Sequence, residues 1–213
     1  MRFTTNLTAG DAASILDAQA PGRPAFVEHS HVVSKVARSI ALALRESETG
    51  IDVERIATRA MLHDFGRSCT HGNYHGWVGY AMLRRRGLAH YARGCVTHWL
   101  RGLPLEEVLH LSPSARPQFM KRVYEELDLP QMTDDDLVVS VADFSVAHTS
   151  IVPLEERERD LVARYGDSRW LRRNAELARA HRSELERRTG LSLDQIVPEL
   201  GKHRDAAREG LHK

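Results

Sequence analysis

Apolar positions recur at three- and four-residue steps along most of the chain, which is the period of an amphipathic α-helix. The clearest stripe predicts a helix over residues 27–46, and its members are Val33, Val36, Ala37, Ile40 and Leu44. A shorter helix over 11–18 precedes it, and the PGRP segment at 21–24 ends that helix. The pattern therefore predicts an all-α protein.

Helix start and stop signals divide the next part of the chain. Asp52 is a typical N-cap for a third helix, which runs directly into His63. Two further helices are predicted over 74–86, closed by Gly87, and over 89–100, closed by Gly102. Pro104 then begins another short helix.

The second half of the chain carries one strong helix start. Thr133 precedes three aspartates, which favour the positive end of a helix dipole, and the helix is predicted to carry Asp143 and to continue through Val146 and Ala147. Segment 103–132, including the SPSARP stretch at 112–117, is otherwise interpreted as loop. Amphipathic helices are expected over 154–165 and 168–188, followed by a basic, frayed tail from Gly201.

These elements predict one all-helical domain with additions at both ends. We expect an N-terminal helix and linker at 1–26, the main helical bundle at 27–150, and a C-terminal helical extension at 151–213 packed on the same domain. The amphipathic extension suits packing on the core, covering a pocket or forming a homodimer interface.

Composition excludes several classes of protein. The 213 residues are 42% hydrophobic, enough for a real core, and the 30 basic and 29 acidic residues nearly cancel. We therefore expect neither a nucleic-acid polymer nor a membrane as partner. The two cysteines fit a reducing compartment, and no apolar stretch approaches the roughly 18 residues of a membrane helix. With no export signal visible at the N-terminus, the expected location is cytoplasmic.

Twelve histidines outnumber the ten Tyr and Phe residues together, without forming a His-rich tract. Phosphate-loop, dinucleotide-binding, serine-hydrolase and HExxH motifs are absent from the sequence. What remains is an ordered series of candidate metal ligands on successive helices: His31, the adjacent pair His63 and Asp64, His75, His98 and Asp143. The series indicates metal chemistry.

Residue types and positions explain why this series could bind metal. An adjacent His-Asp pair at a helix end can turn both side chains toward one point, and the Asp64 carboxylate can bridge two ions. His31 and Asp143 would complete the set, while His75 and His98, both placed next to core positions, could hold a second ion. Neutral imidazoles with carboxylates predict one or two divalent ions, from Fe, Mn, Co, Zn or Mg.

The charge balance of such a site favours a phosphate substrate. Two divalent ions bring about four positive charges and the two aspartates return two, so a positive pocket remains. Lys35, one helical turn after His31, and Arg67, just after the HDFG turn, are predicted to add donors for phosphoryl oxygens. His71 follows in the loop and is a candidate for substrate contact or proton donation.

The sequence around these residues resembles that of the HD-domain superfamily of metal-dependent phosphohydrolases. MLHDFGR is similar to the family's LLHDIGK pattern, and HDFGRSCTHGNYHGWVGYAMLRRRGL looks like small, mostly uncharacterised HDIG proteins. The resemblance covers roughly 27–150. It implies that His31, His63, Asp64 and Asp143 are the core ligands, with His75 and His98 at the positions of dinuclear members. Arg67 replaces the commoner lysine and keeps a positive donor.

The resulting hypothesis is hydrolysis of a phosphate ester, of a nucleotide or small phosphorylated metabolite, by a metal-activated hydroxide formed because the cation lowers the pKa of water to about 7. Lys35, Arg67 and Arg101 would neutralise the developing charge, while Asp64 or His71 handles protons. Two alternatives stay open. One is a di-iron oxygenase that cleaves a C–P or C–C bond, and the other is a nucleotide-binding HD module without catalysis.

Overall fold

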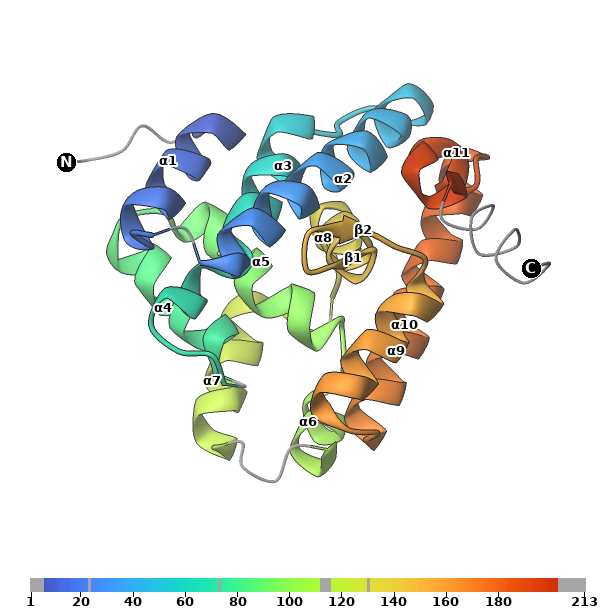
Figure 1. Ribbon diagram of the computed structural model, residues 1–213. Helices are drawn as coiled ribbons and strands as arrows, with labels where there is room; N and C mark the ends of the chain where they lie inside the picture. Colours follow the sequence, from blue (N-terminus) through green and yellow to red (C-terminus); the bar gives the residue numbers. More distant parts are fainter. Residues whose placement is uncertain (1–5, 23, 73, 112–115, 130, 203–213) are drawn as a thin grey trace.

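The computed structural model describes residues 6–22, 24–72, 74–111, 116–129 and 131–202, and these are mostly helical (Figure 1). In chain order the elements are α1 (Ala9–Gln19), α2 (Ala25–Ser47), α3 (Val53–Leu62), the 3-10 helix η1 (Phe65–Ser68), α4 (His75–Arg85), α5 (Ala89–Leu100), α6 (Leu105–Leu111), α7 (Pro117–Leu127), α8 (Asp134–Phe144), β1 (Val146–Ala147), β2 (Ser150–Ile151), α9 (Leu154–Tyr165), α10 (Arg169–Thr189) and α11 (Leu193–Ile196). The predicted all-α class is confirmed.

Local sequence signals explain where the principal helices begin and which face they bury. The Asp52 carboxylate accepts a hydrogen bond from the Arg55 amide at the start of α3. Thr133 and Asp136 form a capping box at the start of α8, each side chain accepting from the other's backbone amide. The apolar stripe predicted within 27–46 is buried along α2.

Two segments differ from the sequence-based expectation. The short helix predicted from Pro104 is present as α6, but the rest of segment 103–132, interpreted from the sequence as loop, contains α7, and α7 buries Met120, Val123 and Tyr124 at helical spacing. The predicted continuation of α8 through Val146 and Ala147 is wrong, because these residues form β1 and pair antiparallel with Ile151 and Ser150 of β2. His148, with a φ of 54°, makes the tight turn between the two strands. The expectations for 112–115 and for the tail beyond 202 lie outside the described residues.

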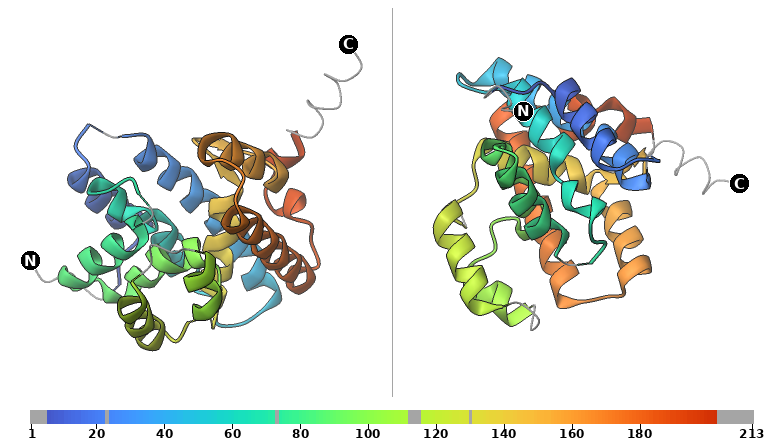
Figure 2. Two further views of the ribbon diagram at one scale, coloured as in Figure 1. Left: turned by 90° about the horizontal axis from the view of Figure 1, so that it is seen from below. Right: turned by 90° about the vertical axis from the view of Figure 1, so that its left-hand side faces the viewer.

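The buried side chains form two hydrophobic clusters. The first joins residues mainly from α1, α4, α5, α6 and α7, and the second joins residues mainly from α2, α8, α9, α10 and α11, while α3 contributes to both. In Figures 1 and 2, α9 and α10 lie beside each other on one side of α8, and α4 and α5 lie on the other side. The C-terminal helices therefore share a core with α2 and α8, since Ala175, Ala178 and Leu185 are fully buried there.

Glycines let three backbone segments of the first cluster approach closely. A Cβ atom on Gly66 in η1 would lie 2.0 Å from the His75 carbonyl oxygen, and one on Gly76 would lie 2.5 Å from the Cys95 carbonyl oxygen. Both separations are far shorter than any allowed contact, so η1, α4 and α5 can pack in this way only with glycine at these positions. This packing brings the ends of η1 and α4 next to the middle of α5.

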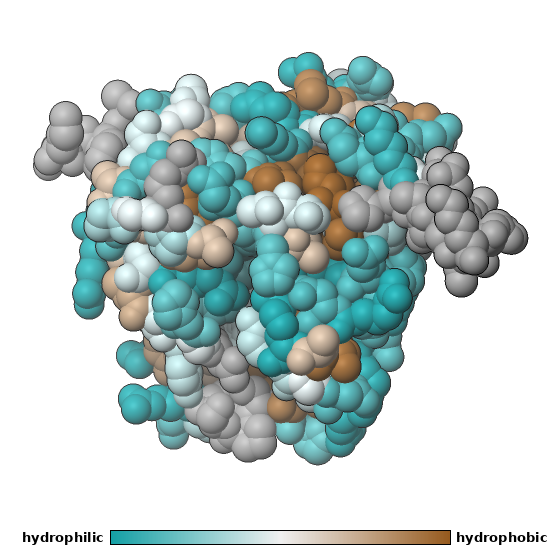
Figure 3. All heavy atoms as spheres, viewed as in Figure 1, coloured by the Kyte–Doolittle hydropathy of each residue, from teal (hydrophilic) through white to brown (hydrophobic). Residues whose placement is uncertain are grey.

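The face seen in Figure 3 is largely hydrophilic, with apolar residues gathered in small patches. Among the helices of the described ranges, none is long and apolar enough to cross a lipid bilayer.

We expect Gly66→Ala to destabilise the protein by about 3 kcal/mol or more, because the new methyl group overlaps the His75 carbonyl. For a chain of this length, that loss corresponds to a melting temperature lower by roughly 6 to 12 °C. Gly10→Ala is the control, since a Cβ in exposed α1 meets only the Thr8 hydroxyl at 3.6 Å. It should be neutral or stabilising by up to about 1 kcal/mol. Equal melting temperatures for both variants would contradict this account of the η1 packing.

Candidate metal centre

Four imidazoles converge at the junction of the two hydrophobic clusters, and each is oriented by a backbone carbonyl. The Nδ1 atoms lie 2.9 Å from the His148 oxygen for His29, 2.7 Å from the Ala60 oxygen for His63, 3.0 Å from the Gly72 oxygen for His75, and 2.9 Å from the Gly94 oxygen for His98. A carbonyl oxygen can only accept, so each Nδ1 carries the proton and donates it. In the neutral rings every Nε2 atom therefore carries a lone pair.

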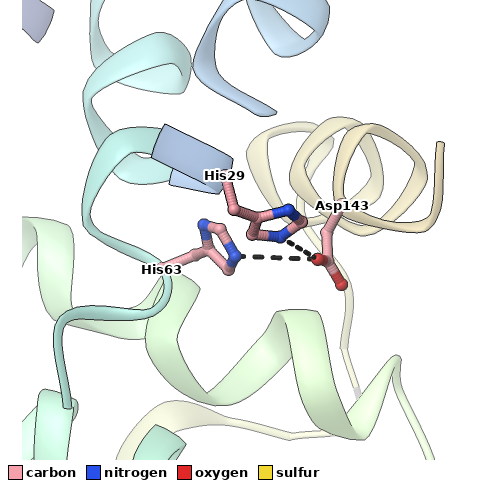
Figure 4. Close-up of side chains that lie close together, drawn as sticks. All are labelled: His29, His63 and Asp143. Atoms are coloured by element: carbon pink, nitrogen blue, oxygen red, sulfur yellow. Dashed lines mark hydrogen bonds and ion pairs between the residues drawn. The ribbon is translucent and has the colours of Figure 1, made fainter. Parts of the chain in front are cut away.

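The Nε2 atoms face one another and two carboxylates. His29 Nε2 lies 3.2 Å from Asp143 Oδ1, and Figure 4 shows His63 pointing at the same carboxylate, with its Nε2 3.6 Å from Oδ1. Asp64 lies at the other end of the cluster, with its Oδ1 3.2 Å from His75 Nε2. His75 Nε2 and His98 Nε2 are 3.2 Å apart. Lone pairs at such distances repel each other unless a cation lies among them.

Two buried atoms of the cluster have no hydrogen-bond partner among the described residues, and they are His63 Nε2 and Asp64 Oδ1. An unsatisfied buried acceptor is unfavourable, and both atoms here are good metal donors. The potential ligand atoms of His29, His63 and Asp143 lie within 4.8 Å of one another, and so do those of His63, Asp64 and His98. Buried His/Asp groups of this kind are consistent with divalent metal binding.

Burial and charge set the protonation states of the cluster. Burial lowers the pKa of His63 and of His75, and it lowers the pKa of His98 to about 3, so these imidazoles are neutral near pH 7. Burial alone would raise the pKa of Asp64, but electrostatic interactions with the His63 ring and the Arg67 guanidinium hold that pKa below its ordinary value. The site thus presents neutral nitrogen donors and anionic oxygen donors together, which is the donor set of many divalent metal sites.

Two arginines bind the outer oxygens of the carboxylates. Arg67 Nε donates to Asp64 Oδ2 at 2.6 Å, and Arg101 Nη2 donates to Asp143 Oδ2 at 2.8 Å. Arg101 ends α5 in the left-handed conformation, with a φ of 51°, and also donates to the backbone oxygen and hydroxyl of Ser140. Because both guanidiniums also line the adjoining cavity, each can reach a ligand as well as a carboxylate.

A cavity of about 620 Å³ opens from the cluster. Its inner end is lined by His29, Asp64, His75, His98 and Asp143, and its outer walls come from the start of α2, the end of α5 and the helices α9 and α10. The volume lies in the range of pockets for small organic ligands.

The structure places His29, rather than the predicted ligand His31, in this cluster. Residues two apart on a helix are rotated by about 200° around its axis and so point in nearly opposite directions, and only one of the two histidines can face the core. His29 lies four residues before Val33 on the buried stripe and is 7% exposed. His31 is partly exposed on another face of α2, with its Nε2 3.9 Å from Asp17 Oδ1. The other predicted ligands, His63, Asp64, His75, His98 and Asp143, lie together as described.

The same helical register explains the position of Lys35. This residue follows His31 by one turn, is exposed, and does not line the cavity. Arg67 and the exposed His71 both line it, as predicted for residues near a substrate. Sequence reasoning did not single out Arg157 and Arg164, which also line the cavity from α9. No motif marks these two arginines in a helix rich in charge.

Comparisons with known proteins agree with this geometry. The HD domain family matches residues 26–144, which include every residue of the histidine and aspartate cluster. An uncharacterized protein of Methanocaldococcus jannaschii, MJ0778, is 30% identical over 141 residues, which make up 66% of this chain and 77% of that protein. No solved structure matches the chain significantly.

We expect His29→Ala to weaken divalent metal binding by at least about 100-fold, because it removes a donor nitrogen that faces Asp143. His31→Ala is a matched control two residues away on the same helix, and it should keep its metal. Metal content by elemental analysis after dialysis, with titration of Mn²⁺ into the chelator-treated protein, measures both. Loss of binding in His31→Ala with retention in His29→Ala would reverse the assignment.

The metal-free protein should lose stability on acidification. The folded state holds His63, His75 and His98 with lowered pKa values, while the unfolded chain takes up protons at the ordinary histidine pKa of 6.5. The unfolded state therefore binds more protons below pH 6.5, and the free energy of unfolding falls as the pH drops from there toward about 3. Urea unfolding with EDTA at several pH values measures the slope. His98→Gln should make the free energy of unfolding depend less steeply on pH, whatever the absolute stability of that variant. A free energy of unfolding that does not change with pH in the wild type would refute the neutral-imidazole description.

Proposed function

Because the chain belongs to the HD-domain family, we propose that it is a metal-dependent phosphohydrolase that cleaves the phosphate ester of a nucleotide or small phosphorylated metabolite. The observation that carries the proposal is the convergence of four imidazole Nε2 atoms on two carboxylates. A positive, cavity-linked centre of this composition suits a phosphate substrate. The resemblance inferred from MLHDFGR agrees with the family match.

The residues present would hold one or two divalent ions. His29, His63, Asp64 and Asp143 supply the core donors, and His75 and His98 supply two more beside Asp64. Bound there, a divalent cation would lower the pKa of water toward neutrality and draw negative charge from phosphoryl oxygens. The carbonyl partners of the four Nδ1 atoms keep the rings in the donor orientation, so binding needs little reorganisation of the side chains.

The arginines and the exposed histidine account for the other requirements of the reaction. In hydrolysis a water oxygen bonds to phosphorus, the ester P–O bond breaks, and the departing alcohol oxygen takes a proton. Arg67 and Arg101 line the cavity beside the aspartates and would neutralise charge on the phosphoryl oxygens. His71 lines the same cavity while remaining exposed, so it can exchange protons with water and supply one to the alcohol.

A second candidate function is oxygen-dependent cleavage of a C–P or C–C bond at a di-iron centre. His75 and His98 are both present, with their Nε2 atoms 3.2 Å apart beside Asp64, and this favours a site for two metals. Such a two-metal site is what the oxygenase would require. Oxygen consumption by iron-loaded protein, measured with phosphonates and phosphate esters side by side, distinguishes it. Phosphate release without oxygen uptake supports the hydrolase.

The direct test is metal analysis of untagged protein purified without chelator, paired with a screen of phosphate esters for phosphate release. We expect one or two divalent ions per chain and metal-dependent release from at least one class of small ester. A metal-loaded protein that hydrolyses none of them and consumes no oxygen would favour the non-catalytic binding module.

Single substitutions separate the roles of the charged residues. Asp64→Ala should abolish metal binding and turnover together, because it removes the donor next to both His63 and His75. Arg67→Ala should lower kcat by about 100-fold while leaving the metal bound, as expected when one donor to a developing anion is lost. Lys35→Ala should change neither, since Lys35 lies outside the cavity. Steady-state kinetics with metal analysis of each variant measures these effects, and an active Asp64→Ala would overturn the assignment.

A further inference from the structure

The outer wall of the cavity comes from a part of the chain beyond the family match. The HD domain family covers 26–144, whereas Arg157, Arg164, Tyr165 and Trp170 belong to α9 and α10 and line the same cavity as the metal centre. A ligand that reaches the metal centre is therefore surrounded by C-terminal residues as well as by the HD domain.

Arg157 and Arg164 share one carboxylate. Arg157 Nη1 donates to Asp160 Oδ2 at 2.7 Å, and Arg164 Nη2 donates to the same oxygen at 2.6 Å. The Arg157 side chain is only 10% exposed, and its Nε has no hydrogen-bond partner among the described residues. Two guanidiniums on one carboxylate leave a positive charge and unused donors at this wall.

The cavity as a whole also carries an excess of positive charge. Arg67, Arg101, Arg157 and Arg164 line it, and the carboxylates bound to them are those of Asp64, Asp143 and Asp160. The arginines exceed the carboxylates by one before any divalent ion is counted, and each ion adds two positive charges. Arg101 and Arg157 also repel each other electrostatically. A single phosphate monoester, with at most two negative charges, compensates only part of this field when ions are bound.

The cavity is also lined by large apolar side chains. The rings of Trp99 and Trp170 have their centroids 4.7 Å apart at an angle of 35°, and both line the cavity together with Phe26 and Leu161. Such a surface suits the organic part of a ligand. The arrangement fits a molecule with one anionic group at the metal centre and another at α9.

We propose that Arg157 and Arg164 are specificity-determining residues that bind a second anionic group of the substrate, a phosphate or a carboxylate. The identity of the reacting group rests on the proposed phosphohydrolase function, but binding of the second anion does not require turnover. Asp160 occupies the two guanidiniums when the second anion is absent and shares them when it is bound.

The experiment compares α,ω-alkanediol bisphosphates and ω-carboxyalkyl phosphates, with chains of two to six carbons, against the alkyl monophosphates of equal length. Binding is measured by calorimetry and by tryptophan fluorescence, in the metal-free and Mn²⁺-loaded protein, and kcat and KM are measured separately. At least one of the bifunctional ligands should bind about tenfold more tightly than the alkyl monophosphate of equal chain length, as expected for an added charge-assisted contact. The relative affinities of the two series show whether a phosphate or a carboxylate is preferred.

Variants of α9 assign the effect to these residues. Arg164→Gln and Arg157→Gln should each remove the preference while leaving affinity for the monophosphate nearly unchanged, so KM for the bifunctional ester rises and kcat for the monoester does not fall. Arg164 is the decisive variant if buried Arg157→Gln fails to fold. Arg159→Gln is the matched control, because Arg159 is exposed on the same helix and does not line the cavity. The Arg159→Gln protein should keep the wild-type preference for bifunctional ligands over monophosphates.

The outcomes separate this proposal from the proposed function. Tighter binding of bifunctional ligands without any hydrolysis would support the second anion site and reject the phosphohydrolase. Hydrolysis of monoesters with no preference at any chain length, or a preference that survives Arg164→Gln, would overturn the role of α9 and leave the phosphohydrolase standing.

Discussion

Mutual repulsion among buried lone pairs is the constraint on which the rest of this structure depends. Four backbone carbonyls fix the protons of His29, His63, His75 and His98 on Nδ1, which leaves each Nε2 facing another acceptor. Protonating these rings would relieve the repulsion, but burial lowers the pKa of three of them. A divalent cation would relieve it without a proton, so the carbonyls that orient the four rings prepare the cluster for metal.

This cluster lies where the two hydrophobic cores meet, and both cores contribute to it. His29 and Asp143 come from α2 and α8, which share one core, while His75 and His98 come from α4 and α5 of the other. His63 and Asp64 follow α3, which contributes to both. The close glycine contacts of η1 with α4 set the distance from Asp64 to His75. The packing of the two cores against each other therefore also determines the geometry of the donors, so stability and metal binding should be coupled in this protein.

The sequence predicted the helices better than the residues that face the site. Periodicity and capping located α2, α3 and α8, because those signals are local. The choice of His31 ignored that His29, not His31, continues the stripe of Val33, Ala37 and Ile40, and the choice of Lys35 inherited that register error. The turn at His148 could not be predicted, since Val146 and Ala147 fit a helix equally well and only the pairing with β2 decides. Arg157 and Arg164 carry no local signal, because their role arises from the packing of α9 over the cavity.

His148 connects the metal centre to the arginines of α9. Its carbonyl oxygen orients His29, and its side-chain Nε2 lies 3.6 Å from Asp160, the carboxylate shared by Arg157 and Arg164. The left-handed backbone at this residue is what lets the chain turn from β1 to β2 and on into α9. The residue that orients His29 therefore also lies beside the carboxylate that the two arginines of α9 share. The C-terminal helices are in this sense part of the site, although the family match ends at residue 144.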